Sequence, residues 1–343
     1  MLDDLNYIRE KDPQDALGVA AKQWQQLTHN FQVTGDKFHD ISNIVLAGMG
    51  GSGWPAAYLQ SWPGVTLPFE INRNYSIPRY VNQNTLFIAS SYSGNTEEVI
   101  SALGEALDRK AQIAVMTSGG RLKEIAKDKK LPLFELPSGT QPRMSSFYFI
   151  AALLELLAPL KIVDPKSLED RKDISEWLKD KTNSWRPNVP TAKNPAKQLA
   201  TELMGRTVIV YSGPIMAPAA HKWKISMTEN AKNLAWWNQY PELNHNEFTG
   251  WTGHPTQKPF AVVEIRSNLE HSRVQKRFLV TERLLSGKRP APRVVQPQGE
   301  TIPEQLFWTS MFGDYVSIYL ALLNGVNPTP VELVEKFKLA MGK

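Results

Sequence analysis

The stretch of residues 85–103 constrains the fold of this chain more than any other part of the sequence. An apolar run at 85–89 is followed by a hydroxyl-rich segment and then by a helical pattern at 97–103. This order predicts a buried strand, a tight turn and a helix. Because a helix N-terminus attracts anions, the turn would form a cradle for a phosphate monoester, with Gly94 letting the backbone approach closely. The hydroxyls belong to Ser90, Ser91, Ser93 and Thr96.

A plainer interpretation of this turn is an ordinary helix N-cap, since Ser, Asn and Thr are favoured there. A second turn of small residues, 48–53, follows the apolar run 44–47 and contains four glycines. Its glycines fit the dinucleotide pattern G-x-G-x-x-G, which also needs an acidic residue at the end of the next strand. Glu70 is near the expected distance, but it lies inside 67–72, which continues as strand. A sugar phosphate is therefore favoured over a dinucleotide.

Strand patterns alternate with helical patterns along the whole chain, which predicts an α/β fold with largely parallel sheets covered on both faces. The unit at 207–220 faintly repeats the unit at 44–57, and 343 residues suggest two domains. We expect a helical lead-in and first domain at 1–160, a connecting segment at 161–198 and a second domain at 199–343. Strands are expected at 44–47, 67–72, 85–89, 111–116, 131–136, 207–213 and 260–265, and helices near 145–157, 272–285, 303–323 and 332–341.

The composition excludes several classes of protein. No apolar run approaches the ~20 residues of a membrane span, and the longest candidate, 147–157, carries Glu155. The chain has no cysteine, which excludes disulfides, thiolate metal sites and cysteine nucleophiles. A net charge of +5 without a basic stripe does not indicate nucleic-acid binding. The acidic first residues lack the order of a signal peptide, so we expect a cytoplasmic protein.

Residues 221–251 combine a helix of about five turns with a loop rich in titratable groups and amides. Carboxylates and a histidine close in sequence are the raw material of proton transfer. Taken alone, Glu229 is better explained as one partner of a surface ion pair with Lys232 than as a catalytic base. His245, Glu247 and His254 are residue types that bind zinc, but their spacing matches no helical ligand motif, so we expect no metal.

The short motifs of this chain, taken in the order in which they follow one another along the sequence, resemble those of the bifunctional phosphoglucose/phosphomannose isomerases. Those enzymes are built from two sugar-isomerase (SIS) domains. The resemblance covers most of the chain and implies two tandem SIS domains, each a mostly parallel sheet flanked by helices. It further implies an aldose–ketose isomerase that interconverts glucose 6-phosphate and fructose 6-phosphate, and also mannose 6-phosphate, without a cofactor. The motifs that carry it lie at 48–53, 91–96, 117–120, 141–143, 229–232, 241–246 and 325–328.

The resemblance also implies roles for single residues. Glu229 matches the base that moves a proton between C1 and C2, and Arg143 matches the cation beside the developing enediolate. His245 matches the residue that opens the sugar ring, which in relatives comes from the partner subunit of a homodimer. Lys338 matches a lysine assigned to ring opening and substrate contact. The matches to the phosphate and sugar contacts are Gly51, Ser52, Ser91, Ser93 and Thr96.

Elementary chemistry agrees with these roles. Proton transfer between adjacent carbons needs one carboxylate that accepts and returns the proton, and a fixed positive charge for the oxyanion. Arginine stays protonated and has a planar fork, while histidine titrates nearest neutrality and suits ring opening. One departure concerns mannose 6-phosphate: relatives carry a threonine where this chain has Val331, with Thr329 two residues earlier. Either Thr329 takes over after a local shift, or this activity is diminished.

Two other functions fit part of the sequence. The isomerase half of a glucosamine-6-phosphate synthase also has tandem SIS domains, but that enzyme needs a cysteine nucleophile, which this chain lacks. A non-catalytic phosphosugar-binding regulator would keep the hydroxyl cradle and dispense with the base. Turnover of fructose 6-phosphate distinguishes the regulator from the isomerase.

Overall fold

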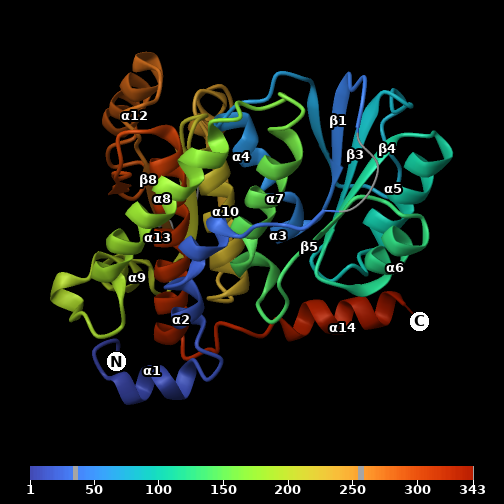
Figure 1. Ribbon diagram of the computed structural model, residues 1–343. Coiled ribbons are helices and arrows are strands. Elements are labelled where there is room, and N and C mark those ends of the chain that lie inside the picture. The colour runs from blue at the N-terminus through green and yellow to red at the C-terminus, as the bar shows by residue number, and fades with distance from the viewer. Residues whose placement is uncertain (34–37, 254–258, 343) are drawn as a thin grey trace. The chain divides into compact units, whose positions relative to one another are not determined.

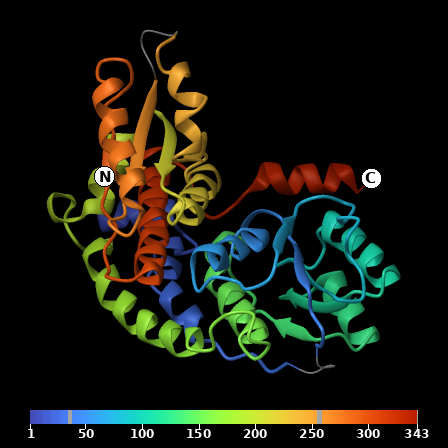
Figure 2. The ribbon, with the colours of Figure 1, turned by 90° about the horizontal axis from the view of Figure 1, so that it is seen from above.

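The computed structural model describes residues 1–33, 38–253 and 259–342. Their contacts divide the chain into two compact units, shown in Figures 1 and 2. Unit 2 is continuous in sequence and comprises Lys22–Lys179, whereas unit 1 combines Met1–Ala21 with Asp180–Lys343.

Unit 2 is built on a five-stranded parallel sheet with the order β2-β1-β3-β4-β5. In its register, Ile44 of β1 pairs with Leu86 of β3, and the pairing continues residue by residue to Ala47 and Ala89 near the carboxyl ends of the two strands. Helices α5 and α6 cover one face and α4 and α7 the other (Figure 1). The strands are β1 (Asn43–Ala47), β2 (Phe69–Asn72), β3 (Thr85–Ser90), β4 (Gln112–Thr117) and β5 (Leu133–Glu135). The helices are η1 (Gln23–Thr28), α3 (Gly50–Gly53), α4 (Ala56–Ser61), α5 (Glu97–Asp108), α6 (Gly120–Asp128), η2 (Pro142–Met144), α7 (Ser146–Leu157) and α8 (Ser167–Lys181).

Alternate residues of the central strands form the core beneath α5 and α6. Val45, Phe87 and Val115 are buried together with Leu103 of α5 and Leu122 of α6. Every residue of β3 is buried, as expected of a central strand in a parallel sheet with both faces covered. The apolar runs of the sequence therefore form strands because both of their faces are removed from water.

Unit 1 carries a four-stranded parallel sheet with the order β7-β6-β8-β9, the same order as the first four strands of the other sheet. The strands are β6 (Thr207–Ser212), β7 (Ala235–Gln239), β8 (Phe260–Ile265) and β9 (Arg293–Val295). The helices are α1 (Leu5–Lys11), α2 (Ala16–Ala20), η3 (Thr182–Trp185), η4 (Thr191–Lys193), α9 (Pro195–Leu203), α10 (Ala217–Glu229), η5 (Glu242–Asn244), α11 (Glu247–Gly250), α12 (Ser272–Leu284), α13 (Ile302–Leu323) and α14 (Glu332–Met341).

The predicted α/β fold with parallel sheets flanked by helices is confirmed, although two details of unit 1 differ from expectation. The helix in the 221–251 region is α10, with 13 residues, and the segment after it contains the strand β7 instead of only a loop. Helix α13, with 22 residues, is long and apolar enough to cross a membrane by length and composition, a property not predicted from the sequence. Its most apolar window is 94% buried inside the protein, because α13 packs against α9 and α10 as a core helix.

The contact grouping also divides the chain differently from the expected boundaries at 160 and 198. The lead-in was expected to pack on the first domain, but Met1–Ala21 belongs to unit 1. The Tyr7 hydroxyl donates to the Leu322 carbonyl at 2.7 Å, and the buried Lys197 ammonium donates to Asp3 at 3.1 Å. These bonds attach the first residues to α13 and α9.

Candidate functional site

The strand order of the sheet determines where the candidate site of unit 2 lies. Because β2 and β3 lie on opposite sides of β1, the connections from β1 and β3 leave the sheet on opposite faces. In open parallel sheets, ligands bind in the crevice at the carboxyl ends of two such strands. Strand β1 ends at Ala47 and β3 at Ser90, so the glycine turn (residues 48–53) and the hydroxyl turn (residues 91–96) both start at this crevice.

In the hydroxyl turn, the side chains face one another. Ser91 Oγ lies 2.7 Å from Thr96 Oγ1 and accepts the Gly94 N–H at 3.2 Å. The exposed Ser93 hydroxyl accepts the Asn95 N–H at 3.3 Å. Thr96 is the N-cap residue of α5, yet among the described residues its side chain makes no capping hydrogen bond. The hydroxyls therefore gather beside the start of α5 rather than capping it, which favours the anion cradle over the plain N-cap.

A third turn, residues 117–120, packs against the hydroxyl turn. Gly94 has φ +70°, and a Cβ there would lie 1.8 Å from the Gly119 carbonyl oxygen. The Ser118 hydroxyl donates to the Tyr92 carbonyl at 2.7 Å, and the Arg121 N–H donates to Asn95 Oδ1 at 2.9 Å. This close approach explains why the hydroxyl turn needs glycine at position 94.

The glycine turn is joined directly to the hydroxyl turn. Ser52 Oγ accepts the Tyr92 N–H at 2.9 Å, and the Ser90 hydroxyl donates to the Ser52 carbonyl at 2.8 Å. A Cβ on Gly51 would lie 2.8 Å from the backbone nitrogen of Arg143. The glycine turn therefore touches both the hydroxyl turn and the segment that carries Arg143.

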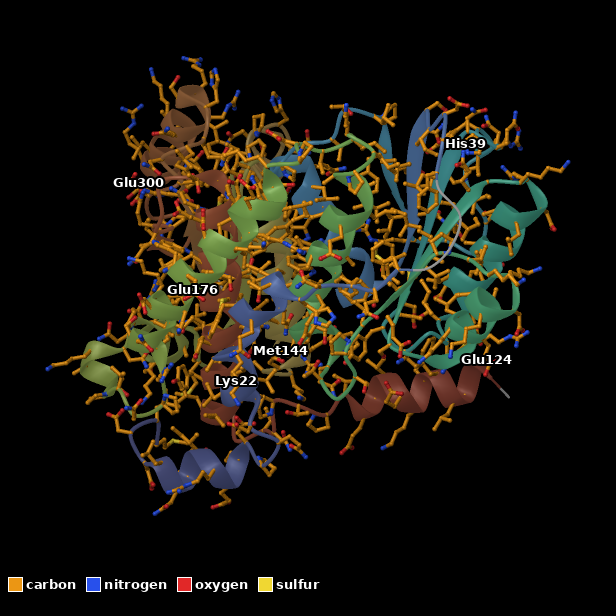
Figure 3. The ribbon with its side chains drawn as sticks, in the orientation of Figure 1. Lys22, His39, Glu124, Met144, Glu176 and Glu300 are labelled. Carbon is orange, nitrogen blue, oxygen red and sulfur yellow. The ribbon has the colours of Figure 1, made fainter. Side chains whose placement is uncertain are left out.

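Arg143 is 1% exposed and lies in η2, at the start of α7. Its segment is fixed from two directions: the Tyr92 hydroxyl donates to the Pro137 carbonyl at 2.9 Å, and Gln26 donates to the Met144 carbonyl at 2.7 Å. Met144 is labelled in Figure 3. A guanidinium stays protonated, and a buried cation is stable only beside acceptors or an anion. The Arg143 backbone lies against the glycine turn, and its side chain is buried.

In unit 1, Glu229 is the last residue of α10 and is half-buried. Lys232, at φ +51°, donates to the Glu229 carbonyl at 3.0 Å and to the Asn327 carbonyl at 2.7 Å. A cation at a helix C-terminus is favourable because the last carbonyls have no partner within the helix. The ammonium group thereby connects the motifs at 229–232 and 325–328, which lie far apart in the sequence.

Helix α10 is fixed to α13 by buried polar contacts. Lys222 and Asp314 form an ion pair in which each side chain is 1% exposed. Ser226 donates to Asp314 at 2.6 Å, and Asn230 donates to Ser317 at 2.9 Å. Breaking one partner of such a buried pair leaves an uncompensated charge, so the pair restricts the position of α10 and of Glu229 at its end.

His245 is exposed and follows η5 in the segment after β7. Glu247, two residues later, accepts hydrogen bonds from the Tyr211 hydroxyl and, at 2.6 Å, from Asn238. Burial, and then the Glu247 carboxylate, raise the pKa of Tyr211 well above its usual range. Glu242 accepts a bond of 2.7 Å from Asn246. Both carboxylates near His245 therefore hold the loop in place.

The remaining expected residues lie elsewhere. Lys338 is exposed on α14 and pairs with Glu335 at 2.8 Å, and Val331 is the N-cap residue of α14. His254 lies outside the described residues. Within 1–33, 38–253 and 259–342, no three His, Asp or Glu side chains form a group that could hold a metal ion.

The structure brings the candidate phosphate residues and the segment of Arg143 together within unit 2. Glu229, His245 and Lys338 lie on three separate segments of unit 1. The residues that support the site were not predicted from the sequence. Tyr92 lies inside the motif at 91–96, and its place there is a signal from which its bonds to the neighbouring turns could be suspected. Tyr211 and Glu247 are 36 residues apart, and no sequence pattern links them.

The chain is similar to known proteins along most of its length. A family model described as "Bacterial phospho-glucose isomerase C-terminal SIS domain" matches residues 192–341. A bifunctional phosphoglucose/phosphomannose isomerase of Caldicellulosiruptor bescii is 35% identical, covering 88% of this chain and 90% of the relative. One of the same name from Aquifex aeolicus is 32% identical, with 88% and 90% covered. The crystal structure of a glucose-6-phosphate isomerase like protein from Thermus thermophilus is 19% identical, with a TM-score of 0.66 and 98% of each chain covered.

Proposed function

Because the chain belongs to the family of bifunctional phosphoglucose/phosphomannose isomerases, we propose that it interconverts glucose 6-phosphate, fructose 6-phosphate and mannose 6-phosphate. The reaction would proceed by proton transfer between C1 and C2 through a cis-enediol. The proposal needs a phosphate site, a fixed cation, a base and a ring-opening group in one chain, and candidates for all four are present.

One observation carries the proposal. The hydroxyl turn and the glycine turn meet at the carboxyl ends of β1 and β3, and Gly51 approaches the backbone of the buried Arg143. Uncapped helix N–H groups, several hydroxyls and a permanent cation together suit a dianionic phosphate monoester whose sugar develops an enediolate. A dinucleotide site is not favoured, because Glu70 lies in the middle of β2 and accepts a bond from Tyr80 at 2.6 Å.

In this proposal, Gly51, Ser52, Ser91, Ser93 and Thr96 contact the phosphate and the sugar. Ser93 is the most direct test, because its exposed hydroxyl supports little else in the fold. Ser93→Ala should lose a hydrogen bond to a charged group, worth about 1.5–3 kcal/mol, and so weaken binding of fructose 6-phosphate and 5-phosphoarabinonate by roughly ten- to a hundredfold. Ser101→Ala, on the exposed side of α5, is the matched control and should leave both affinities unchanged. Unchanged affinities in Ser93→Ala would mean that the cradle is misplaced.

The proton chemistry would be divided among four side chains. Glu229 would accept the proton from one carbon and return it to the other, and Arg143 would stabilise the enediolate oxygen. His245 would exchange protons with the ring oxygens during ring opening, assisted by Lys338. The rigid attachment of α10 to α13 supports Glu229 in this role, since a base must keep its geometry through both half-reactions. The reaction requires no metal, because proton transfer alone moves the carbonyl.

The decisive experiment is incubation of the purified protein with fructose 6-phosphate, with glucose 6-phosphate detected by a coupled dehydrogenase. We expect turnover without added metal, also in the presence of a chelator. Absence of turnover, with binding of fructose 6-phosphate retained, would favour the phosphosugar-binding regulator instead.

Three finer points belong to the same proposal. We propose a homodimer in which His245 completes the site of the partner subunit. We propose activity on mannose 6-phosphate, which can be tested in the same assay and by Val331→Thr, expected to raise that activity relative to glucose 6-phosphate. We also propose that the enzyme works in the cytoplasm, since a chain without cysteine gains nothing from an oxidising compartment.

A further inference from the structure

The sheet of unit 1 has the same strand order around β6 and β8 as the sheet of unit 2 has around β1 and β3. Its strand order again leaves two neighbouring strands, β6 and β8, whose connections depart on opposite faces. The loop after β3 has six residues before α5 begins, and the loop after β8 also has six residues before α12 begins. Gly213 follows β6 just as Gly48 follows β1. The carboxyl ends of the two central strand pairs are therefore comparable in strand order, in the glycine after the first strand and in the length of the loop after the second.

The contents of the second crevice are different. Instead of a row of hydroxyls, the loop after β8 places Glu270 there, with only 4% of the residue exposed. The Glu270 carboxylate accepts the Met216 N–H at 3.2 Å, and Ile215 provides another backbone N–H. Met216 is the N-cap residue of α10, a helix of 13 residues. A carboxylate thus lies where the helix N-terminus would receive a phosphate.

Several contacts keep the carboxylate in this place. A Cβ on Gly213 would lie 2.3 Å from the Glu270 carboxyl carbon, so only glycine leaves room for it. The Glu270 carbonyl accepts a bond of 2.8 Å from Gln275 of α12. Burial raises the pKa of Glu270 to about 7, and the two N–H groups lower it only in part. The Ser212 hydroxyl, immediately before Gly213, is fully buried and has no hydrogen-bond partner among the described residues.

We propose that the crevice between β6 and β8 is a second anion cradle of the phosphate type, and that Glu270 occupies it as a permanent internal ligand. The ligand class of the cradle is a tetrahedral oxyanion such as inorganic phosphate. Glu270 excludes it by occupying both the space beside Gly213 and the N–H groups at α10. Each chain then offers one phosphate site, in unit 2, although both sheets have the topology for one.

The test is to empty the second cradle while leaving the first intact. Glu270→Ser removes the carboxylate and supplies a hydroxyl, whereas Glu270→Gln keeps the side-chain volume and serves as the matched control. Inorganic phosphate is titrated into the full-length protein at pH 8 and followed by calorimetry. We expect one phosphate per chain for wild type and for Glu270→Gln, and two for Glu270→Ser. Adding Ser93→Ala to Glu270→Ser should weaken one of the two sites and leave the other unchanged.

A folded Glu270→Ser protein that binds a single phosphate would overturn the proposal. If this variant does not fold in phosphate-free buffer, the proposal requires that high phosphate restores the fold, because a ligand that binds only the folded state stabilises it. A variant that stays unfolded in phosphate would equally overturn it. The phosphate count does not depend on isomerase activity, so a failed turnover assay and a failed second cradle are distinguishable.

Discussion

Gly94→Ala tests whether the close approach of the hydroxyl turn to Gly119 holds the crevice of unit 2 together. Two costs add up. An L-residue at φ +70° in the left-handed region costs about 1–2 kcal/mol. The new Cβ would also lie 1.8 Å from the Gly119 carbonyl oxygen, where ordinary contact begins at 3.4 Å, so the two turns must separate.

Separation of the turns would weaken two backbone bonds, from the Leu122 N–H to the Gly94 carbonyl at 2.9 Å and from the Ser118 N–H to the Tyr92 carbonyl at 3.0 Å. Such bonds contribute about 0.5–1.5 kcal/mol each. Together with the left-handed strain, we expect the free energy of unfolding to fall by about 3 kcal/mol. Phosphate affinity should fall as well, because the hydroxyls of Ser91 and Ser93 move with the turn.

The measurement is urea unfolding followed by circular dichroism, with phosphate affinity from calorimetry on the folded protein. Gly104→Ala is the matched control in the same segment, because Gly104 is exposed inside α5 and a methyl group there would meet nothing within 4 Å outside its own stretch of helix. This control should stabilise the protein by about 0.5–1 kcal/mol, since alanine is the better helix former. If Gly94→Ala is as stable as wild type while Gly104→Ala behaves as expected, the reasoning about the turn is refuted.

Three further predictions concern the base, the dimer and the second crevice. Glu229→Gln should lower isomerisation by about 10²–10⁴-fold and abolish deuterium entry at C2 of the glucose product in deuterated water, with phosphate binding retained; wild-type exchange in the variant would exclude Glu229 as the base. Mixed subunits of His245→Ala and Glu229→Ala should recover activity if the partner subunit supplies His245, and no recovery after proven subunit exchange would mean that each site lies within one chain. The folded-state pKa of Glu270, about 7, lies above its ordinary value of 4.5, so its contribution to stability is present below about pH 4.5 and lost as pH rises through about 7. From about pH 5 to about pH 8, wild type should lose about 2–3 kcal/mol more stability than Glu270→Gln, and parallel profiles would contradict the assignment.

The strands of both sheets were predictable where burial on two faces makes the sequence continuously apolar. Strand β3, with six buried residues, is the clearest case. Strand β7 was missed because it lies at the edge of its sheet, where Trp236 is 51% exposed and two of the five positions carry amides. Strand β9 has only three residues, too few to show a period. Local patterns thus reveal central strands, whereas edge strands depend on neighbours that the sequence does not display.

In the candidate site, too, local features were predictable from the sequence and contacts between distant residues were not. The turns at 48–53 and 91–96 were predictable because glycines and hydroxyl residues stand between an apolar run and a helical pattern in each of them. The bond from the Tyr92 N–H to Ser52 Oγ joins residues 40 positions apart, and nothing local in the sequence indicates it. In the alternative explanation of Glu229, Lys232 is its surface partner; in the structure the Lys232 ammonium donates to main-chain carbonyls, including that of Asn327. Tertiary proximity gives this lysine an acceptor, the Asn327 carbonyl, that the residues around it in the sequence do not offer.

The discontinuity of unit 1 has a consequence for how the protein is made. Unit 2 emerges from the ribosome as one uninterrupted segment and can fold as soon as Lys179 is available. The docking of Met1–Ala21 is complete only after α13 is made, because the acceptor of the Tyr7 hydroxyl is the Leu322 carbonyl. At a synthesis rate of about 5–20 residues per second, that delay is on the order of tens of seconds. During this interval the Asp3 carboxylate can already pair with Lys197 of α9, whereas the bond from Tyr7 to α13 forms last.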